Sequence, residues 1–114
     1  MNAFRSLAFV ILFLGVTSVA FAQEGQPPVT ITPVQEVLTN TPDDAYVTIQ
    51  GRLVEYLGDE DYVLEDETGR ITVEIDDDLL EPRDFAAGML VEVFGEVDRE
   101  RHGVELEAER IRIL

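Results

Sequence analysis

The sequence predicts a mostly β protein, in which five strands form one small closed barrel with a short helix before the first strand. Three observations predict this fold. Apolar and polar residues alternate along five separate stretches, acidic and glycine-containing turns join them, and a glycine interrupts the first stretch where a strongly curved sheet would bend. Closing the barrel also removes the exposed sheet edges that a small β domain must otherwise protect.

The first 22 residues are predicted to be a cleaved signal peptide. Arg5 supplies a positive charge, residues 7–16 are apolar, and residues 20–22 (Ala-Phe-Ala) have the small-x-small pattern that precedes a cleavage site. The alternative, an uncleaved membrane anchor, is disfavoured because the apolar run is shorter than a typical membrane span. We therefore expect export to the periplasm and no stable membrane insertion after cleavage.

The rest of the chain is predicted to contain a flexible leader at residues 23–29 and one domain at residues 30–114. At the start of the domain, Thr32 and Pro33 are typical of a helix N-cap and first helical residue. The apolar spacing that follows predicts one short helix that ends before Pro42. We expect this helix to close an open end of the barrel.

The five strands are expected to cover residues 45–56, 62–66, 70–75, 89–98 and 104–114. In the first strand, Gly51 predicts a bend or bulge, because glycine weakens a regular strand. Gly69 closes the hairpin after the second strand, at a position that we expect to require positive φ. In the last strand the alternation changes phase after Ala108, which predicts a bulge near Glu109 and Arg110.

The alternation stops between residues 76 and 88. There, Leu79, Leu80 and Phe85 are expected to cover the mouth of the barrel as a loop or a single helical turn. Five short strands with a long first strand, and a non-strand segment between the third and fourth, are typical of the OB fold. An open five-stranded meander and an SH3-like barrel have the same strand count and are the competing topologies.

The chain is strongly acidic. It has 24 Asp and Glu residues against 8 basic residues, all of them Arg, and a formal net charge of −16. Such a field repels phosphate backbones and attracts cations, so nucleic acid is not an expected partner. A nucleic-acid-binding OB domain would be supported by analogy of fold alone. The plain alternative for the acidity is solubility in a salty or high-GC host, where acidic, lysine-poor surfaces are common.

Motifs in the predicted strands carry a family resemblance. They are DAYVTIQG at 44–51, YVLEDETG at 62–69, ITVEID at 71–76, GEVD at 95–98 and VEL at 104–106. In this order and behind a signal peptide, they resemble the bacterial OB-fold family of periplasmic stress-tolerance proteins, the YgiW/YdeI type. The resemblance implies an exported domain tied to tolerance of oxidative, acid, metal or cationic-peptide stress, and it implies no catalytic residues.

Candidate ligand-binding residues lie on the face of the predicted second and third strands and next to it, where OB folds commonly bind their ligands. They are Arg52, Tyr62, Glu65, Glu74 and Asp76. Acidic turns at residues 59–61 and 65–67 flank the second strand, either as plain solvated turns or as a rim that collects cations. We expect a non-catalytic binding protein that contributes to envelope stress tolerance by engaging a cationic small molecule, a basic peptide or an envelope protein.

The alternative function is that of a divalent-metal-binding acidic periplasmic protein. Carboxylates suit Ca²⁺ and Mg²⁺, and residues 76–78 (Asp-Asp-Asp) are the densest carboxylate group. Three consecutive side chains cannot all converge on one ion, however, so the sequence assigns no metal ligands and no cofactor.

Enzyme activity is not expected. The predicted mature chain has no cysteine and no serine, and its one histidine, His102, falls in a predicted turn. Paired carboxylates need an enclosed site that shifts their pKa values, which a small barrel with exposed acids hardly offers. The aromatic residues that could stack on bases lack the basic groove of single-strand binders, so we expect them to cover the surface or the core; they are Tyr46, Tyr56, Tyr62 and Phe94.

Overall fold

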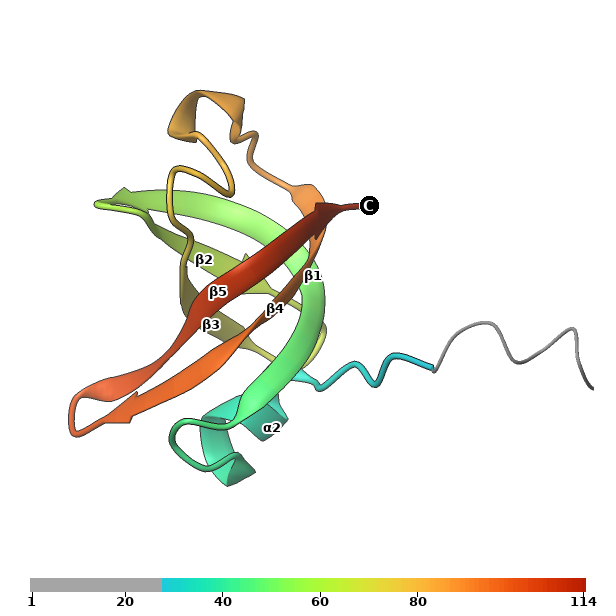
Figure 1. Ribbon diagram of the computed structural model, residues 1–114, viewed down its shortest axis with the longest axis vertical. Coiled ribbons are helices and arrows are strands. Elements are labelled where there is room, and N and C mark those ends of the chain that lie inside the picture. Colours follow the sequence, from blue (N-terminus) through green and yellow to red (C-terminus); the bar gives the residue numbers. More distant parts are fainter. Residues whose placement is uncertain (1–27) are drawn as a thin grey trace, which may run out of the picture.

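The computed structural model describes residues 28–114, so the predicted signal peptide and residues 23–27 of the leader lie outside the described residues. Within residues 28–114 the strands close one barrel in the order β1-β2-β3-β5-β4 (Figure 1). Along the chain the elements are α2 (Val34–Asn40), β1 (Tyr46–Gly58), β2 (Asp61–Glu65), β3 (Arg70–Glu74), the single-turn 3-10 helix η1 (Pro82–Asp84), β4 (Met89–Glu100) and β5 (Gly103–Ile113). Among these five strands only β3 and β5 pair in parallel, and the other neighbours are antiparallel. The predicted five-stranded OB barrel with a short helix is confirmed.

The inward faces of the strands build one hydrophobic core, because alternate residues of each strand point to the same side of the sheet. The core also takes in side chains from α2 and from the segment between β3 and β4. Its buried members are Val34, Val37, Ile49, Leu53, Tyr62, Leu64, Ile71, Val73, Ile75, Leu80, Val91, Val93, Val97 and Leu106. In the segment before β4, Leu79 and Phe85 pack against this core, as predicted for the mouth of the barrel.

Helix α2 closes one end of the barrel (Figure 1), but its cap differs from the predicted one. Pro33 occupies the N-cap position in place of Thr32, and no side chain at that position caps the helix. The first helical N–H, that of Val34, is bonded instead to the carboxylate of Asp66 at 2.9 Å. Val37, one turn later, is fully buried and anchors the helix on the core. None of the helices in the described residues is long and apolar enough to span a membrane.

Gly51 lets two strands approach closely. A Cβ atom on Gly51 would lie 2.5 Å from the backbone oxygen of Glu65, so no other residue fits there without a shift of the backbone. Strand β1 is strongly curved, as Figure 1 shows, in agreement with the predicted bend. The irregular steps in its pairing with β2 fall after Leu53 and after Tyr56, so the bulges are not at Gly51 itself.

The predicted bulge in the last strand is confirmed. Phe94 pairs with Arg110 and Gly95 with Ala108, which leaves Glu109 as the extra residue of β5. The hairpin between β4 and β5 is tighter than predicted, because β4 continues to Glu100 and β5 begins at Gly103.

The expectation of positive φ at Gly69 is wrong. Among the described glycines, positive φ occurs at Gly58, Gly88 and Gly103. The hairpin between β2 and β3 is closed by a backbone hydrogen bond from the N–H of Asp66 to the oxygen of Gly69 at 3.0 Å. The Asp66 side chain supports the turn, because one of its carboxylate oxygens accepts the N–H groups of Thr68 and Gly69.

Candidate functional site

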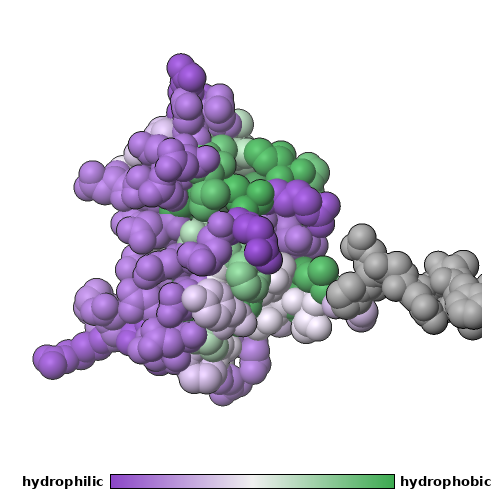
Figure 2. Space-filling model, viewed as in Figure 1, coloured by the Kyte–Doolittle hydropathy of each residue, from purple (hydrophilic) through white to green (hydrophobic). Residues whose placement is uncertain are grey.

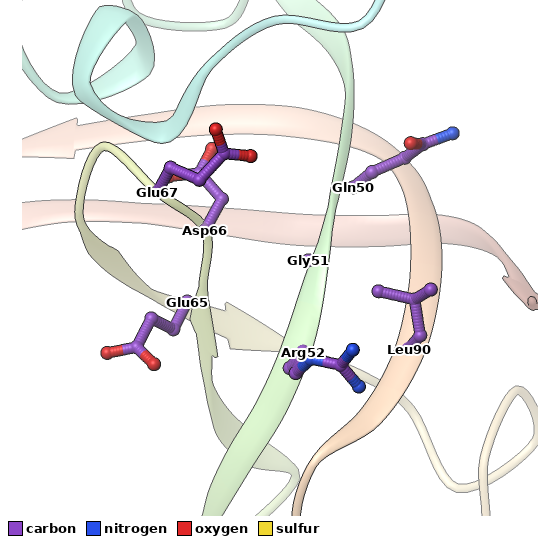
Figure 3. Close-up of a pocket in the computed structure, with 7 residues that line it drawn as sticks. All are labelled: Gln50, Gly51, Arg52, Glu65, Asp66, Glu67 and Leu90. Atoms are coloured by element: carbon purple, nitrogen blue, oxygen red, sulfur yellow. The ribbon is translucent and has the colours of Figure 1, made fainter.

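Two of the predicted site residues lie in an open groove between β1 and β2. Arg52 and Glu65 are cross-strand partners, yet their side chains extend away from each other (Figure 3). Arg52 donates to the backbone oxygen of Gly88 at 2.8 Å, and Glu65 is paired with Arg70 at 2.7 Å. Both polar groups are therefore already engaged within the protein. The groove, of about 420 Å³, is lined by Gln50, Gly51, Arg52, Glu65, Asp66, Glu67 and Leu90.

The predicted placement of Tyr62 on the ligand-binding face of the sheet is wrong. Its side chain is 0% exposed and belongs to the core, on the same face of β2 as Leu64. The sequence left this undecided, because Val63 and Leu64 are both apolar and either phase of alternation fits the strand. Asp76 is exposed in the turn after β3, where its carboxylate accepts the N–H of Asp78 at 2.8 Å.

Glu74 is the predicted site residue that lies in a larger arrangement. Asp61 of β2 pairs with Glu74 of β3, Glu74 with Glu107 of β5, and Glu107 with Glu96 of β4. A second row pairs Glu105 of β5 with Asp98 of β4. We call these six residues the acidic ladder: Asp61, Glu74, Glu96, Asp98, Glu105 and Glu107. Hydrophilic residues cover the surface around the β4–β5 hairpin, which carries four of them (Figure 2).

Two carboxylates of the ladder have raised pKa values, in part because other ladder carboxylates lie close to them. Partial burial raises the pKa of Glu74, and the carboxylates of Glu107 and Asp61 raise it further. The pKa of Glu105 is raised in the same way, by burial first and then by Asp61 and Asp98. Like charges that face one another disfavour ionisation of each member. A cation on this surface would therefore relieve repulsion that the folded chain already contains.

Next to the ladder, the outer faces of β4 and β5 carry arginine side chains as well as acidic ones. Arg112 pairs with Glu92 at 3.0 Å, and the guanidinium of Arg110 lies 4.4 Å from the centre of the Phe94 ring. The ring of Tyr46 also stacks on Phe94, with the two ring centres 5.6 Å apart. The outer surface of β4 and β5 is thus divided into a mixed half and an acidic half.

Sequence reasoning missed four of the six ladder residues, namely Glu96, Asp98, Glu105 and Glu107. The sequence did contain a signal for them, because the outward-facing positions of the last two predicted strands are largely acidic. Only the pairing of β3 with β5 brings them beside Glu74 and Asp61. No three acidic or histidine side chains within residues 28–114 are arranged to hold a metal ion.

Comparisons with known proteins agree with the fold. A family model described as "Bacterial OB fold (BOF) protein" matches residues 16–113. The chain is 34% identical over 109 residues to the calcium-regulated OB-fold protein CarO of Pseudomonas aeruginosa, a match that covers 95% of this chain and 92% of CarO. It is 37% identical over 70 residues to Protein YgiW of Escherichia coli K12. That match covers 61% of this chain and only 54% of the length of YgiW.

A solved structure gives the same result. The structure of the hypothetical protein ygiW from E. coli superposes with a TM-score of 0.69 at 33% sequence identity. The match covers 81% of this chain and 100% of that chain. The fold of this chain is therefore shared with a solved structure at 33% sequence identity.

Proposed function

The chain belongs to the bacterial OB-fold family, and from this premise we propose that it is an exported, non-catalytic binding protein whose acidic ladder engages a cationic partner. The observation that carries the proposal is the register of β2, β3, β5 and β4, which aligns Asp61, Glu74, Glu107 and Glu96 in one row. Neighbouring strands lie about 4.8 Å apart, so the row offers several negative groups at regular intervals.

An extended cation with several positive groups, such as a basic peptide, fits this arrangement better than a single metal ion. A metal site needs carboxylates that converge on one point. Here the carboxylates follow one another across the sheet, and no metal-holding group occurs within residues 28–114. We therefore place the metal-binding alternative second. A basic face of an envelope protein is the other partner that the same surface suits.

Export and a role in envelope stress tolerance belong to the same proposal. Export to the periplasm is supported by the pattern of residues 1–22, and the proposed mature chain has a leader at residues 23–29 and its domain at residues 30–114. The relative CarO is named as a calcium-regulated OB-fold protein, not as an enzyme, which agrees with a binding role.

The test compares two variants that change the net charge equally. One carries Glu74→Gln, Glu105→Gln and Glu107→Gln in the ladder. The matched control carries Glu55→Gln, Glu67→Gln and Asp78→Asn, at exposed positions outside it. Binding of a hexa-arginine peptide is measured by calorimetry at low salt, where surface attraction is least screened.

We expect the ladder variant to bind the peptide about tenfold more weakly, because three surface charge contacts are worth about 0.5 kcal/mol each. The control variant should lose about twofold or less. Equal losses in both variants would mean that the peptide responds only to net charge, and the ladder would then have no specific role.

A further inference from the structure

Strand β5 has a free edge beyond the point where β3 ends. Its pairing with β3 covers Glu105, Leu106 and Glu107, whereas its pairing with β4 continues to Ile113. Among the described residues, the second half of β5 is therefore paired on one side only. A strand edge of this kind presents backbone N–H and C=O groups with which another extended chain can pair.

The hydrogen bond at the end of β5 identifies the backbone groups that face this edge. The N–H of Leu114 donates to the oxygen of Leu90 at 2.9 Å. In an antiparallel pair, residues that exchange backbone bonds alternate with residues that do not. Ile111 and Ile113 therefore direct their N–H and C=O groups away from β4. No hydrogen bond joins these groups to another residue in the part of the chain that the structure describes.

A groove adjoins the free edge. It has a volume of about 550 Å³ and lies between Ile113 and the segment that follows β3, where Leu79 and Leu80 line it. Ile113 is 58% exposed, and Figure 2 shows hydrophobic residues gathered at this end of β5. The remaining lining residues are acidic: Asp77, Asp78, Glu81 and Asp84. Glu81 is paired with Arg83 at 2.8 Å, whereas the three aspartates form no salt bridge within residues 28–114.

We propose that the free edge of β5 binds an extended basic peptide segment as an added antiparallel strand. The backbone groups of Ile111 and Ile113 bond to every second residue of this segment. The same residues of the segment point their side chains into the groove, because residues directly opposite each other share a face of the sheet. Lysine or arginine fits there, since its apolar stem packs on the leucines while its charged head reaches the aspartates.

A second copy of this chain fits the edge less well. Two β5 strands can pair antiparallel with Ile111 opposite Ile111, or with Ile111 opposite Ile113. The first register sets Arg110 opposite Arg112, and the second sets Arg112 opposite Arg112. Like charges directly opposite each other destabilise a strand pair. Each full chain also carries a formal net charge of −16, so a basic partner is favoured over a second copy.

The edge site is separate from the acidic ladder. Ile111 lies four residues after Glu107 on β5, and the bulge at Glu109 stands between them. The ladder runs across the strands, whereas the added strand lies along β5. The choice of a basic segment rests on the proposed function, but the free edge does not depend on the ladder.

The probe is the peptide acetyl-Thr-Lys-Thr-Lys-Thr-amide, which is titrated into the ¹⁵N-labelled protein and followed by NMR. We expect the amides of Ile111 and Ile113 to shift, and to exchange with solvent at least fivefold more slowly when the peptide is bound. Methylating both lysine backbone nitrogens should weaken binding about tenfold, because it removes the N–H donors that face β5. The matched control carries the methyl groups on the last two threonine nitrogens, which face away from β5, and should lose about twofold or less. Equal losses for the two methylated peptides would overturn the proposal.

The acidic wall is tested by Asp77→Asn combined with Asp84→Asn. This variant should bind the lysine peptide about fivefold more weakly, because two of the carboxylates that meet the lysines are neutralised. The matched control is Glu55→Gln combined with Glu67→Gln, which removes the same charge at exposed positions outside the groove. Equal losses in the two variants would contradict a basic occupant held by this wall.

The ladder and the edge are distinguished by the two peptides. The ladder variant should keep its affinity for the lysine peptide. If hexa-arginine binding depends on the ladder but the amides of Ile111 and Ile113 do not respond to the lysine peptide, the edge proposal fails and the ladder proposal stands. If the lysine peptide protects these amides but the ladder variant binds hexa-arginine as its control does, the ladder proposal fails instead. Protection that rises with protein concentration in the absence of peptide would assign the edge to a second copy and overturn the proposal.

Discussion

The carboxylate of Asp66 accepts a 2.9 Å hydrogen bond from the backbone N–H of Val34, which lies 32 residues earlier in the chain. Its other oxygen accepts the N–H groups of Thr68 and Gly69 in the turn between β2 and β3. One side chain therefore supports a hairpin turn and caps a helix that its own sequence leaves without a side-chain cap. This contact joins α2 to the barrel at the point where the helix begins.

Replacing Asp66 by Asn should lower the free energy of unfolding by about 2 kcal/mol at neutral pH, because charged hydrogen bonds to backbone N–H groups are lost. Burial alone would raise the pKa of Asp66, but hydrogen bonds from Thr68, Val34 and Gly69 outweigh it and lower the pKa below 3.8. Because the pKa is lower in the folded state, the ionised carboxylate stabilises the protein at pH values above its unfolded-state pKa. This stabilisation is lost as the pH falls through the folded-state pKa. Urea unfolding should thus show a difference in unfolding free energy between the wild type and Asp66→Asn that is smaller at pH 3 than at pH 7.

The control for this measurement is Asp78→Asn, at an exposed position in the turn after β3. It should change the unfolding free energy by less than about 0.5 kcal/mol. A difference between wild type and Asp66→Asn that stays constant from pH 7 to pH 3 would contradict the assignment of the effect to the ionised carboxylate.

Arg99 should be a second anchor of the helix, at its opposite end. The guanidinium donates to the backbone oxygens of Val37 at 2.8 Å, Leu38 at 3.2 Å and Thr41 at 2.8 Å. Arg99→Met should lower the unfolding free energy by about 2–3 kcal/mol, since several charge-assisted bonds to otherwise unpaired carbonyls are lost. Arg99→Lys should restore less than half of that loss, because an ammonium cannot reproduce the planar fork of the guanidinium. Thermal and urea unfolding measure both, with Arg101→Met as the control in an exposed turn.

Gly95 should tolerate no side chain. A Cβ atom there would lie 2.3 Å from the backbone oxygen of Glu107, so Gly95→Ala must push β4 and β5 apart. We expect a loss of at least about 2 kcal/mol in unfolding free energy. The matched control is Gly69→Ala, because a Cβ at Gly69 would meet its nearest atom, of Gln35, at 3.5 Å, which is ordinary contact. A similar cost in both variants would show that the close approach at Gly95 is not the cause.

Neutralising one member of the acidic ladder should stabilise the protein. The pKa of Glu74 is raised above 4.5 by burial and by Glu107 and Asp61, so ionisation at neutral pH costs folding free energy. Stability should rise as the pH falls through the folded pKa towards the unfolded one. Glu74→Gln should therefore raise the melting temperature at pH 7 by a few degrees and bring no gain below pH 4. Calorimetric melts across this range, with Glu55→Gln as control, would contradict the prediction if Glu74→Gln melted lower at pH 7.

Local alternation predicted most of the barrel, because each strand shows one face to the core. It also predicted the bulge, since the phase change after Ala108 leaves one residue over in β5. It failed where two apolar residues adjoin, as at Val63 and Leu64, so the burial of Tyr62 was not predictable from the strand itself. Contacts between distant segments were equally hidden. The parallel pairing of β3 with β5 assembles the ladder, and no local pattern in the sequence specifies which strands become neighbours.

The bulge at Glu109 has a consequence for chain length. Removing that residue would restore strict alternation along β5, so Arg110 and Arg112 would still face outwards and Leu106 and Ile111 would still face the core. The barrel can therefore lose this residue without turning the outer side chains of either half of β5 towards the core. The placement of negative and positive groups on β5 is thus insensitive to deletion of one residue at the point where the acidic and mixed halves meet.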